Sequence, residues 1–371
     1  MSFQDFPIWL NILIFIAAAA AIWYAGGRLE RYTDMLSQRS RLGKAFLGLL
    51  LLSTATGLPE IATTTTAALS GNQDLALYNL FGSIIIQTAI LGGVDLLVSK
   101  GPITRFTPDF AVLMEGIGLI LVIAAALVGI TFDAGLSATL NLECSLLPIG
   151  LGPILAFTAY LVVLFLAHRS QQHARWLPAE LASDPKQASK KKGRSRPGED
   201  QGQSKMDEQM EKLKKKPWGK LLLAFAGFAL VVLVGGWAVA TAGDAISQQT
   251  GLGASFVGFV LLSVATSLPE ISTTTSAVHN GNYSLAYSNI FGSNAFDMAL
   301  LLPAALIYQD VLFEEVSNPI IYAGGLGILV TCIFIWGLLE RRDWTVLRMG
   351  WDSLSVLILC FLGIIGFYFL Q

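Results

Sequence analysis

Long apolar stretches recur along the whole chain, and each has the length that a membrane-spanning helix requires. A helix needs about 20 apolar residues to cross the hydrocarbon core of a bilayer. Ten stretches meet this length, at residues 7–27, 43–69, 73–98, 109–131, 145–168, 218–242, 253–279, 283–308, 318–339 and 351–370. The first follows a leader without Lys or Arg, so we expect a retained span and not a cleaved signal peptide. The pattern predicts an all-α integral membrane protein with ten transmembrane helices.

One part of this pattern occurs twice. Residues 48–83 and 258–293 align without a gap, and 22 of the 36 aligned positions are identical. Because five predicted spans, an odd number, separate the copies, the second copy enters the membrane from the opposite side. Two parallel halves would require an even number of spans. We therefore expect two inverted five-helix halves, residues 1–168 and 218–371, which is an architecture of secondary transporters.

Charge is scarce and unevenly placed. Charged residues make up 13% of the chain, against about 25% in soluble domains. All 24 Lys and Arg lie in the predicted loops 1–2, 3–4, 5–6 and 9–10 or at their edges. Under the positive-inside rule, this distribution places both termini outside a multi-pass cell-membrane protein. Residues 169–217 are charged and poor in aromatic residues, which predicts a flexible, basic cytoplasmic tether between the halves.

Each repeat places a proline inside an apolar helix, followed at once by a glutamate. Proline lacks an N–H and clashes with the carbonyl four residues earlier, so Pro59 and Pro269 predict kinks that free main-chain oxygens. Irregular backbone at membrane depth is tolerated where it is buried in protein or lines a cavity. We therefore expect Glu60 and Glu270 to face a polar site near the middle of the membrane.

Further oxygen donors follow on the next predicted span of each half. Ser83 and Ser293 end two Asn-x-Phe-Gly-Ser motifs, and Gln87 and Asp297 lie one helical turn later on the same face. With the glutamates, these are hard oxygen ligands that suit Na⁺ or Ca²⁺. Pairing of the acids with basic residues is disfavoured because Lys and Arg are confined to loops and their edges. Ionised acids in hydrocarbon are costly, so cations or protons must neutralise them.

The segments TATGLPEI and VATSLPEI, with NLFGS and NIFGSNAFD, resemble the alpha-repeats of the cation/calcium exchanger superfamily, which includes the sodium/calcium exchangers. The resemblance implies that Glu60 and Glu270 are the central Ca²⁺ ligands, shared with Na⁺ in competition. It also implies that the first and sixth spans form a mobile pair that slides across a fixed core. The other ligands it implies are the carbonyls of Thr56 and Thr266, oxygens of Ser53, Ser263, Ser267, Ser83 and Ser293, and the central Gln87 and Asp297 side chains.

Three positions of the first repeat depart from the family pattern. Gly57 stands where a hydroxyl residue is usual, Ile84 replaces Asn, and Gln87 is one methylene longer than Asn. We therefore expect the first repeat to hold its flanking monovalent ion more weakly than the second.

The expected function is that of a secondary antiporter and not of an enzyme. It would exchange Ca²⁺ against Na⁺ by exposing one carboxylate site alternately to each side of the membrane. Two alternatives remain open: an H⁺/cation exchanger in which protonation of the glutamates replaces Na⁺ binding, and a passive cation channel or sensor. The expected partners are the transported ions and the lipid bilayer. We expect no cofactor and no nucleic acid, and a monomer as the working unit.

Overall fold

A computed structural model describes residues 3–39, 56–97, 101–106, 110–140, 149–172, 217–279, 283–308, 318–341, 345–346 and 349–370. The helices of the first half are η1 (Phe3–Asp5), α1 (Ile8–Arg39), α3 (Leu58–Leu69), α4 (Gln73–Leu97), η2 (Ile103–Phe106), α5 (Phe110–Leu140) and α6 (Leu151–Gln172). Those of the second half are α10 (Trp218–Thr250), α11 (Ala254–Phe256), η4 (Val257–Leu262), α12 (Ser263–Thr266), α13 (Leu268–His279), α14 (Tyr283–Ala299), α15 (Leu301–Tyr308), α16 (Asn318–Glu340) and α17 (Trp351–Leu370).

The structure is that of an all-α membrane protein. Seven described helical stretches are long and apolar enough to span a membrane, and the bent pair Ala254–Thr266 and Leu268–His279 makes an eighth. Another, Leu151–Ala167, is apolar but shorter. The predicted spans 43–69 and 145–168 are described only in part, because residues 40–55 and 141–148 lie outside the described ranges. The membrane class is therefore confirmed, whereas the count of ten helices stays a prediction.

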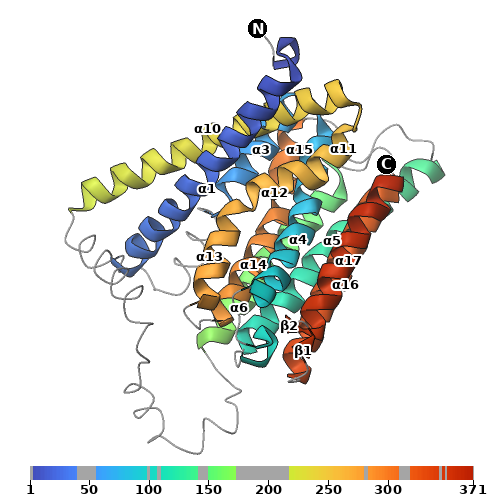
Figure 1. Cartoon of the computed structure of the whole chain (residues 1–371). Helices are drawn as coiled ribbons and strands as arrows, with labels where there is room; N and C mark the ends of the chain where they lie inside the picture. Colours follow the sequence, from blue (N-terminus) through green and yellow to red (C-terminus); the bar gives the residue numbers. More distant parts are fainter. Residues whose placement is uncertain are drawn as a thin grey trace, which may run out of the picture.

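α1 and α10 lie side by side at one flank of the bundle and run in opposite directions (Figure 1). Near the start of α1, Asn11 donates a hydrogen bond to Gln249 Oε1 at 3.2 Å. Near its end, the ring of Tyr32 lies 5.7 Å from that of Phe228. The partner's residue number falls as that of α1 rises, so these two helices, 210 residues apart, are antiparallel as the inverted repeat predicts.

α4 is buried in the bundle between elements of both halves. Gly82 of α4 lies against the Phe259 carbonyl and the Ser263 hydroxyl so closely that no Cβ would fit. The stretch that carries Phe259, η4, is π-helical, and short π-helical stretches occur frequently at functional sites. The Phe259 ring stacks on Phe367 of α17 with centroids 4.0 Å apart. This close packing places the first repeat's Asn-x-Phe-Gly-Ser motif against the second repeat's kinked helix.

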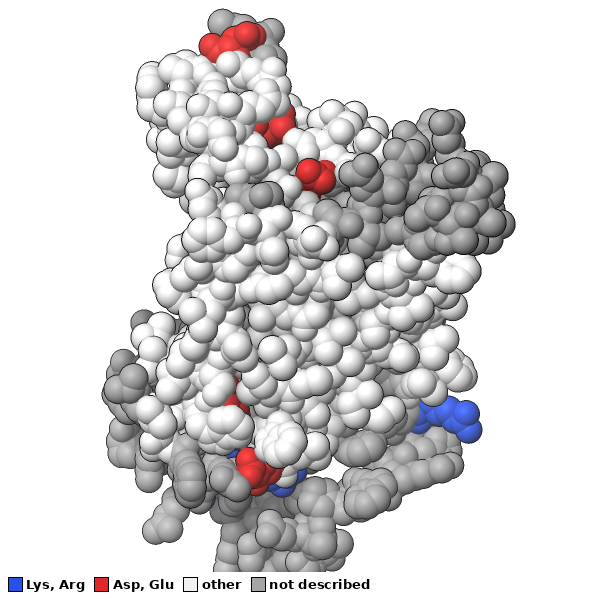
Figure 2. All heavy atoms as spheres, turned by 90° about the vertical axis from the view of Figure 1, so that its right-hand side faces the viewer, with Lys and Arg blue, Asp and Glu red and all other residues white. Residues whose placement is uncertain are grey.

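A two-stranded antiparallel hairpin, β1 (Thr345–Val346) and β2 (Met349–Gly350), precedes α17. The sequence pattern did not predict it. We call the part of the bundle formed by β1, β2, η2, the end of α4 and the start of α17 the hairpin end. Figure 2 shows a broad uncharged belt, with Lys and Arg on this face only toward the bottom and Asp and Glu toward both ends. Such a belt fits the hydrocarbon core of a membrane.

Candidate ion-binding site

The proline of the second repeat breaks its helix as predicted. α12 ends at Thr266 and α13 begins at Leu268, with a bend of 47° between the two parts. Ser267 stands at the break, with φ −81° and ψ 4°. In the first repeat, Gly57 takes the same place, with φ −79° and ψ 4° at the start of α3. Gly57 and Ser267, at equivalent positions of the two repeats, therefore share the same backbone conformation.

Each break is followed by a fully buried glutamate. Glu60 and Glu270 have no solvent exposure, and Glu60 is close enough to Glu270 and Asp297 for the charges to interact. The Thr266 side chain interacts with the Glu60 carboxylate. Neither oxygen of Glu60, however, has a hydrogen-bond partner of standard geometry among the described residues. Burying an ionised carboxylate without compensation is very costly, so Glu60 is suited to bind a cation or a proton.

A chain of side chains connects the two halves beside these glutamates. Ser293 of α14 donates to Gln87 Oε1 of α4 at 2.7 Å. Gln87 in turn donates from Nε2 to Asp297 Oδ2 at 3.1 Å. All three side chains are buried, and Asp297 Oδ1 has no hydrogen-bond partner among the described residues. The amide of Gln87 thereby orients Asp297 and leaves one carboxylate oxygen available to a ligand.

Two predicted serine ligands keep unused oxygens. Ser83 Oγ and Ser267 Oγ are buried and have no hydrogen-bond partner in the described structure. Ser263 is engaged differently, because its hydroxyl lies 2.9 Å from the Asn79 carbonyl and 3.0 Å from that of Gly258. Its hydroxyl proton therefore serves helix packing, and only its lone pairs remain for an ion.

Two of the remaining predicted ligands, Thr56 and Thr266, lie within the described structure. Thr56 and Thr266 are both buried, at 3% and 0% exposure. Thr266 Oγ1 lies 3.4 Å from the Ser263 carbonyl. Ser53 lies outside the described residues.

In each half, one asparagine fastens the helix after the break to its neighbour. Asn79 donates to Thr63 Oγ1 at 3.1 Å, and its duplicate Asn289 donates to Thr273 Oγ1 at 2.7 Å. Thr63 Oγ1 lies 2.9 Å from the carbonyl of Pro59. The hydroxyl runs of both repeats thus include residues that hold the kinks in place, as expected of Thr in packed membrane helices.

Two further residues near this site were not among the predicted ligands. Asn294, directly after Ser293, is fully buried, and no described residue forms a hydrogen bond with its Oδ1. Its Nδ2 lies 3.4 Å from Thr88 Oγ1 of α4. Tyr160 of α6 is close enough to Asp297 to feel its charge. Asn294 stands inside the NIFGSNAFD motif and could have been found there, whereas no sequence signal indicated Tyr160.

The arrangement is not a compact cluster of acids. No three Asp, Glu, His or Cys side chains of the described residues converge as they would around one metal ion. An ion held by Glu60, Glu270 or Asp297 would therefore take most of its ligands from hydroxyl, amide and main-chain oxygens. Ca²⁺ and Na⁺ accept such mixed oxygen shells.

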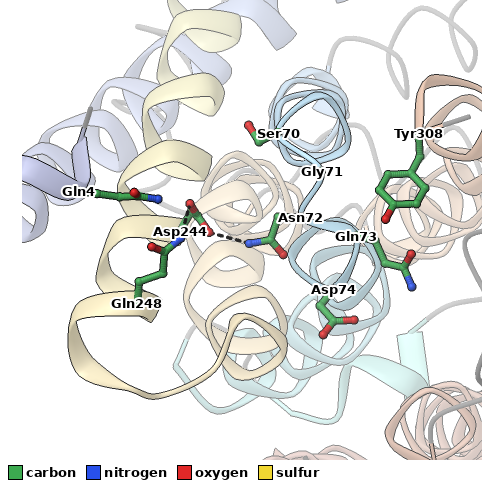
Figure 3. A pocket seen from close by; sticks show the side chains of 9 residues that line it. All are labelled: Gln4, Ser70, Gly71, Asn72, Gln73, Asp74, Asp244, Gln248 and Tyr308. Atoms are coloured by element: carbon green, nitrogen blue, oxygen red, sulfur yellow. Dashed lines mark hydrogen bonds between the residues drawn. The ribbon is translucent and has the colours of Figure 1, made fainter. Parts of the chain in front are cut away.

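An open polar cavity of about 580 Å³ lies at the opposite end of α4 from the hairpin. We call this region the pocket end; Figure 3 shows Asp244 and Gln248 of α10 facing the turn between α3 and α4. Asn72 of this turn donates to Asp244 Oδ1 at 2.6 Å, and Gln248 donates to Asp244 Oδ2 at 3.0 Å. The pocket end therefore joins the α1–α10 pair to the rest of the bundle through polar contacts.

Comparisons with known proteins place this architecture in a family. The model of the sodium/calcium exchanger protein family matches residues 10–167 and 220–370. The inner membrane protein YrbG of Escherichia coli is 23% identical over 337 residues, which cover 90% of this chain and 89% of that protein. The sodium/calcium exchanger MaX1 of Methanosarcina acetivorans is 28% identical over 116 residues, 30% of this chain and 33% of that protein.

Two solved structures share the fold. One of the sodium-calcium exchanger NCX_Mj matches with a TM-score of 0.56 at 15% identity, covering 97% of this chain and 99% of that chain. The H⁺/Ca²⁺ exchanger CAX matches with a TM-score of 0.61 at 13% identity, covering 97% and 86%.

The fold and the duplicated, buried acidic site define a multi-pass membrane exchanger of cations. The chain belongs to the sodium/calcium exchanger protein family, and the superfamily resemblance read from the two repeats is confirmed.

Proposed function

We propose that this protein exchanges Ca²⁺ against Na⁺ by alternating access. The observation that carries the proposal is the pair of buried, duplicated glutamates, of which Glu60 has no hydrogen-bond partner of standard geometry in the described structure. A site with these acids needs positive charge to be stable in a membrane. Ca²⁺ and Na⁺ compete for the same oxygens, and a site that is empty and charged is costly to carry between the two states.

Asp297, Gln87 and Ser293 would complete this site between the halves. Asp297 brings the additional charge, and the Gln87 amide fixes its orientation. Ser83 and Ser267 offer hydroxyl oxygens that accept or donate no hydrogen bond within the described part of the chain. The carbonyls of Thr56 and Thr266, with oxygens of Ser53 and Ser263, are the further ligands of this proposal.

The transport step would be a movement of the α1–α10 pair across the remaining helices. α1 packs on α13 and α10 packs on α3, so each mobile helix covers one kinked helix of the site. Sliding of the pair would uncover the glutamates first from one end of the bundle and then from the other. The protein needs no cofactor for this cycle, which a monomer can complete.

The orientation in the membrane follows from the basic residues of the sequence. With Lys and Arg confined to loops on one side, the pocket end and both termini would face outside, and the hairpin end would face the cytoplasm. Residues 169–217 would form a cytoplasmic tether between the halves.

An H⁺/cation exchanger is the second candidate. The specific observation in its favour is Gly57, which supplies no hydroxyl where the second repeat has Ser267. Fewer oxygens in the first repeat weaken a flanking Na⁺ site without affecting protonation of Glu60. The fold likeness to the H⁺/Ca²⁺ exchanger CAX is compatible with this candidate but does not argue for it, since it concerns the fold alone.

Uptake of Ca²⁺ into reconstituted vesicles separates the candidates. Uptake driven by an outward Na⁺ gradient at fixed pH is the result that we expect. Uptake driven by a pH jump alone would replace Na⁺ by H⁺ in the proposal. Flux of Ca²⁺ down its own gradient without any counter-ion would instead indicate a channel.

A further inference from the structure

A second group of buried oxygens lies at the hairpin end, away from the site described above. Asp95 of α4, Asp352 and Ser353 of α17, and Tyr287 of α14 are at most 2% exposed. Asp95 lies eight residues after Gln87 in the same helix, about 12 Å along its axis at 1.5 Å per residue. The group is therefore separate from the central site and belongs to the opposite end of the bundle from the pocket.

These side chains lie close enough to influence one another. Asp95 interacts electrostatically with Asp352, and the Ser353 side chain interacts with the Asp95 carboxylate. The Tyr287 hydroxyl is close enough to feel the charges of both acids. Two carboxylates and two hydroxyls from three different helices thus meet in one buried place.

Three oxygens of this group have no hydrogen-bond partner of standard geometry in the described structure. They are Asp352 Oδ2, Ser353 Oγ and Tyr287 Oη. Buried polar groups are almost always hydrogen-bonded, so each exception needs an explanation, such as a water or an ion. Here three such exceptions lie beside two acids. No Lys or Arg of the described residues pairs with either acid, which points to a missing positive partner.

The surrounding main chain donates hydrogen bonds to Asp95 and leaves space for the carboxylate of Asp352. Asp95 accepts hydrogen bonds from Ile103 N at 3.1 Å and Gly350 N at 2.9 Å, and so ties η2 and β2 to α4. The carboxylate of Asp352 lies between Gly337 and Gly350, and a Cβ on either glycine would collide with it. The site is therefore built from a rigid frame whose glycines leave room for the Asp352 carboxylate.

The two acids and the tyrosine of the group have no counterpart in the other half of the sequence, whereas Glu143 stands opposite Ser353. At the 210-residue offset that relates the two repeats, Ala305 stands opposite Asp95 and Leu77 stands opposite Tyr287. The central acids, Glu60 and Glu270, are by contrast duplicated. A function in the symmetric transport step would be expected in both halves, so this group serves a different purpose.

We propose that Asp95, Asp352, Ser353 and Tyr287 form a second site that binds a divalent cation without transporting it. Two carboxylates match the charge of such an ion, and Ca²⁺ accepts carboxylate and hydroxyl oxygens in flexible geometry. Bound there, the ion ties the start of α17 to α4 and α14 and stabilises the hairpin end. Each Asp95 oxygen already accepts one N–H but keeps a further lone pair for a metal.

The test measures binding in a protein whose central site has been removed. In the purified Glu60→Gln/Glu270→Gln variant, Mn²⁺ binding by electron paramagnetic resonance and the Ca²⁺-dependent rise in melting temperature report a remaining site. We expect about one divalent ion per chain. Adding Asp352→Asn should weaken binding about tenfold or more and remove the thermal stabilisation, because the charge of the ligands sets affinity.

Two further variants keep the result interpretable. Tyr287→Phe keeps the ring contacts with Phe291 and Phe334 and should weaken binding several-fold. Tyr32→Phe, which removes the hydroxyl of a largely buried tyrosine from α1, is the matched control and should have no effect.

The absence of residual binding, or residual binding that neither Asp352→Asn nor Tyr287→Phe alters, would overturn the proposal and leave water as the occupant. The outcome is independent of the exchange mechanism. A failure of the central site would appear as unchanged total binding after the two glutamates are replaced.

Discussion

Gly26 of α1 lies directly against the ring of Pro269, the proline that breaks the second repeat's helix. A Cβ at residue 26 would lie 2.6 Å from Pro269 Cγ. The duplicated contact is present in the other half, where a Cβ at Gly236 of α10 would lie 2.5 Å from Ala62 Cβ and 3.1 Å from the Pro59 carbonyl. Each helix of the α1–α10 pair therefore touches the kink of the opposite half through a glycine.

Enlarging these glycines should slow exchange more than it weakens ion binding. Extra atoms in a tight contact cost about 1–3 kcal/mol, and about 1.4 kcal/mol corresponds to a tenfold change in rate. We expect Gly26→Val or Gly236→Val to reduce the Na⁺-driven Ca²⁺ uptake rate about tenfold, with Ca²⁺ affinity changed less. Gly227→Val on α10 is the control, because no atom of the described residues lies within 4 Å of its Cβ position. Equal losses in all three variants would mean that the contact has no special role.

The hydroxyl group that Ser267 has and Gly57 lacks should raise the apparent affinity for Na⁺. Ser267 Oγ is buried without a hydrogen-bond partner in the described structure, whereas Gly57 at the equivalent position has no side chain. Gly57→Ser adds one oxygen, worth about 1 kcal/mol, so apparent Na⁺ affinity should rise roughly fivefold with little change for Ca²⁺. Ser267→Ala should lower it. The Na⁺ dependence of uptake is the measurement. If Gly57→Ser leaves it unaltered while activity follows pH, the coupling ion is the proton.

The contact between Asn72 and Asp244 should hold the pocket end closed. It joins the turn after α3 to α10 at 2.6 Å (Figure 3), and hydrogen bonds to charged groups contribute about 1.5–3 kcal/mol. Asn72→Ala should therefore favour the state open at this end. A cysteine replacing the buried Ala265 should then react about tenfold faster with an impermeant thiol reagent added from that side. Gln73→Ala, at the neighbouring position, is the control. If the reactivity is unchanged in Asn72→Ala, the contact between Asn72 and Asp244 does not hold the pocket end closed.

The proposed orientation is tested with single cysteines. Asp74 is exposed at the pocket end, so Asp74→Cys should react with an impermeant reagent added outside intact cells. Ser189→Cys, in the basic segment 169–217, should react after the membrane is permeabilised and not before. The reverse pattern at either position would show that the spans were counted wrongly.

The duplicated parts of the site could be predicted from the sequence. Glu60 and Glu270 follow a proline in both copies, and the helix break before Glu270 lies where Pro269 predicts it. The positions of Gln87 and Asp297 suggested a shared centre, and the structure joins them by a hydrogen bond. These residues could be recognised because they occupy equivalent positions in both repeats.

The parts that occur once, or that depend on packing, could not be predicted. Gly26 and Gly236 are in register between the halves, but their contacts with the prolines arise only after the helices cross. Asp352 carries no repeat signal, and its surroundings come from a hairpin that sequence periodicity does not show. Ser53 and the rest of its predicted span up to residue 55 lie outside the described residues, and so does part of the evidence for a ten-helix count.

The central claim is that one site holds both ions through Glu60 and Glu270. Its most direct test is Ca²⁺ uptake into vesicles driven by an outward Na⁺ gradient, in Glu60→Gln and Glu270→Gln separately. Thr241→Val, at a half-buried position of α10, is the control and should transport at the wild-type rate. The account predicts that each glutamine variant folds and inserts normally but loses uptake, because a ligand and a charge have been removed. Uptake at the wild-type rate in either variant would contradict it.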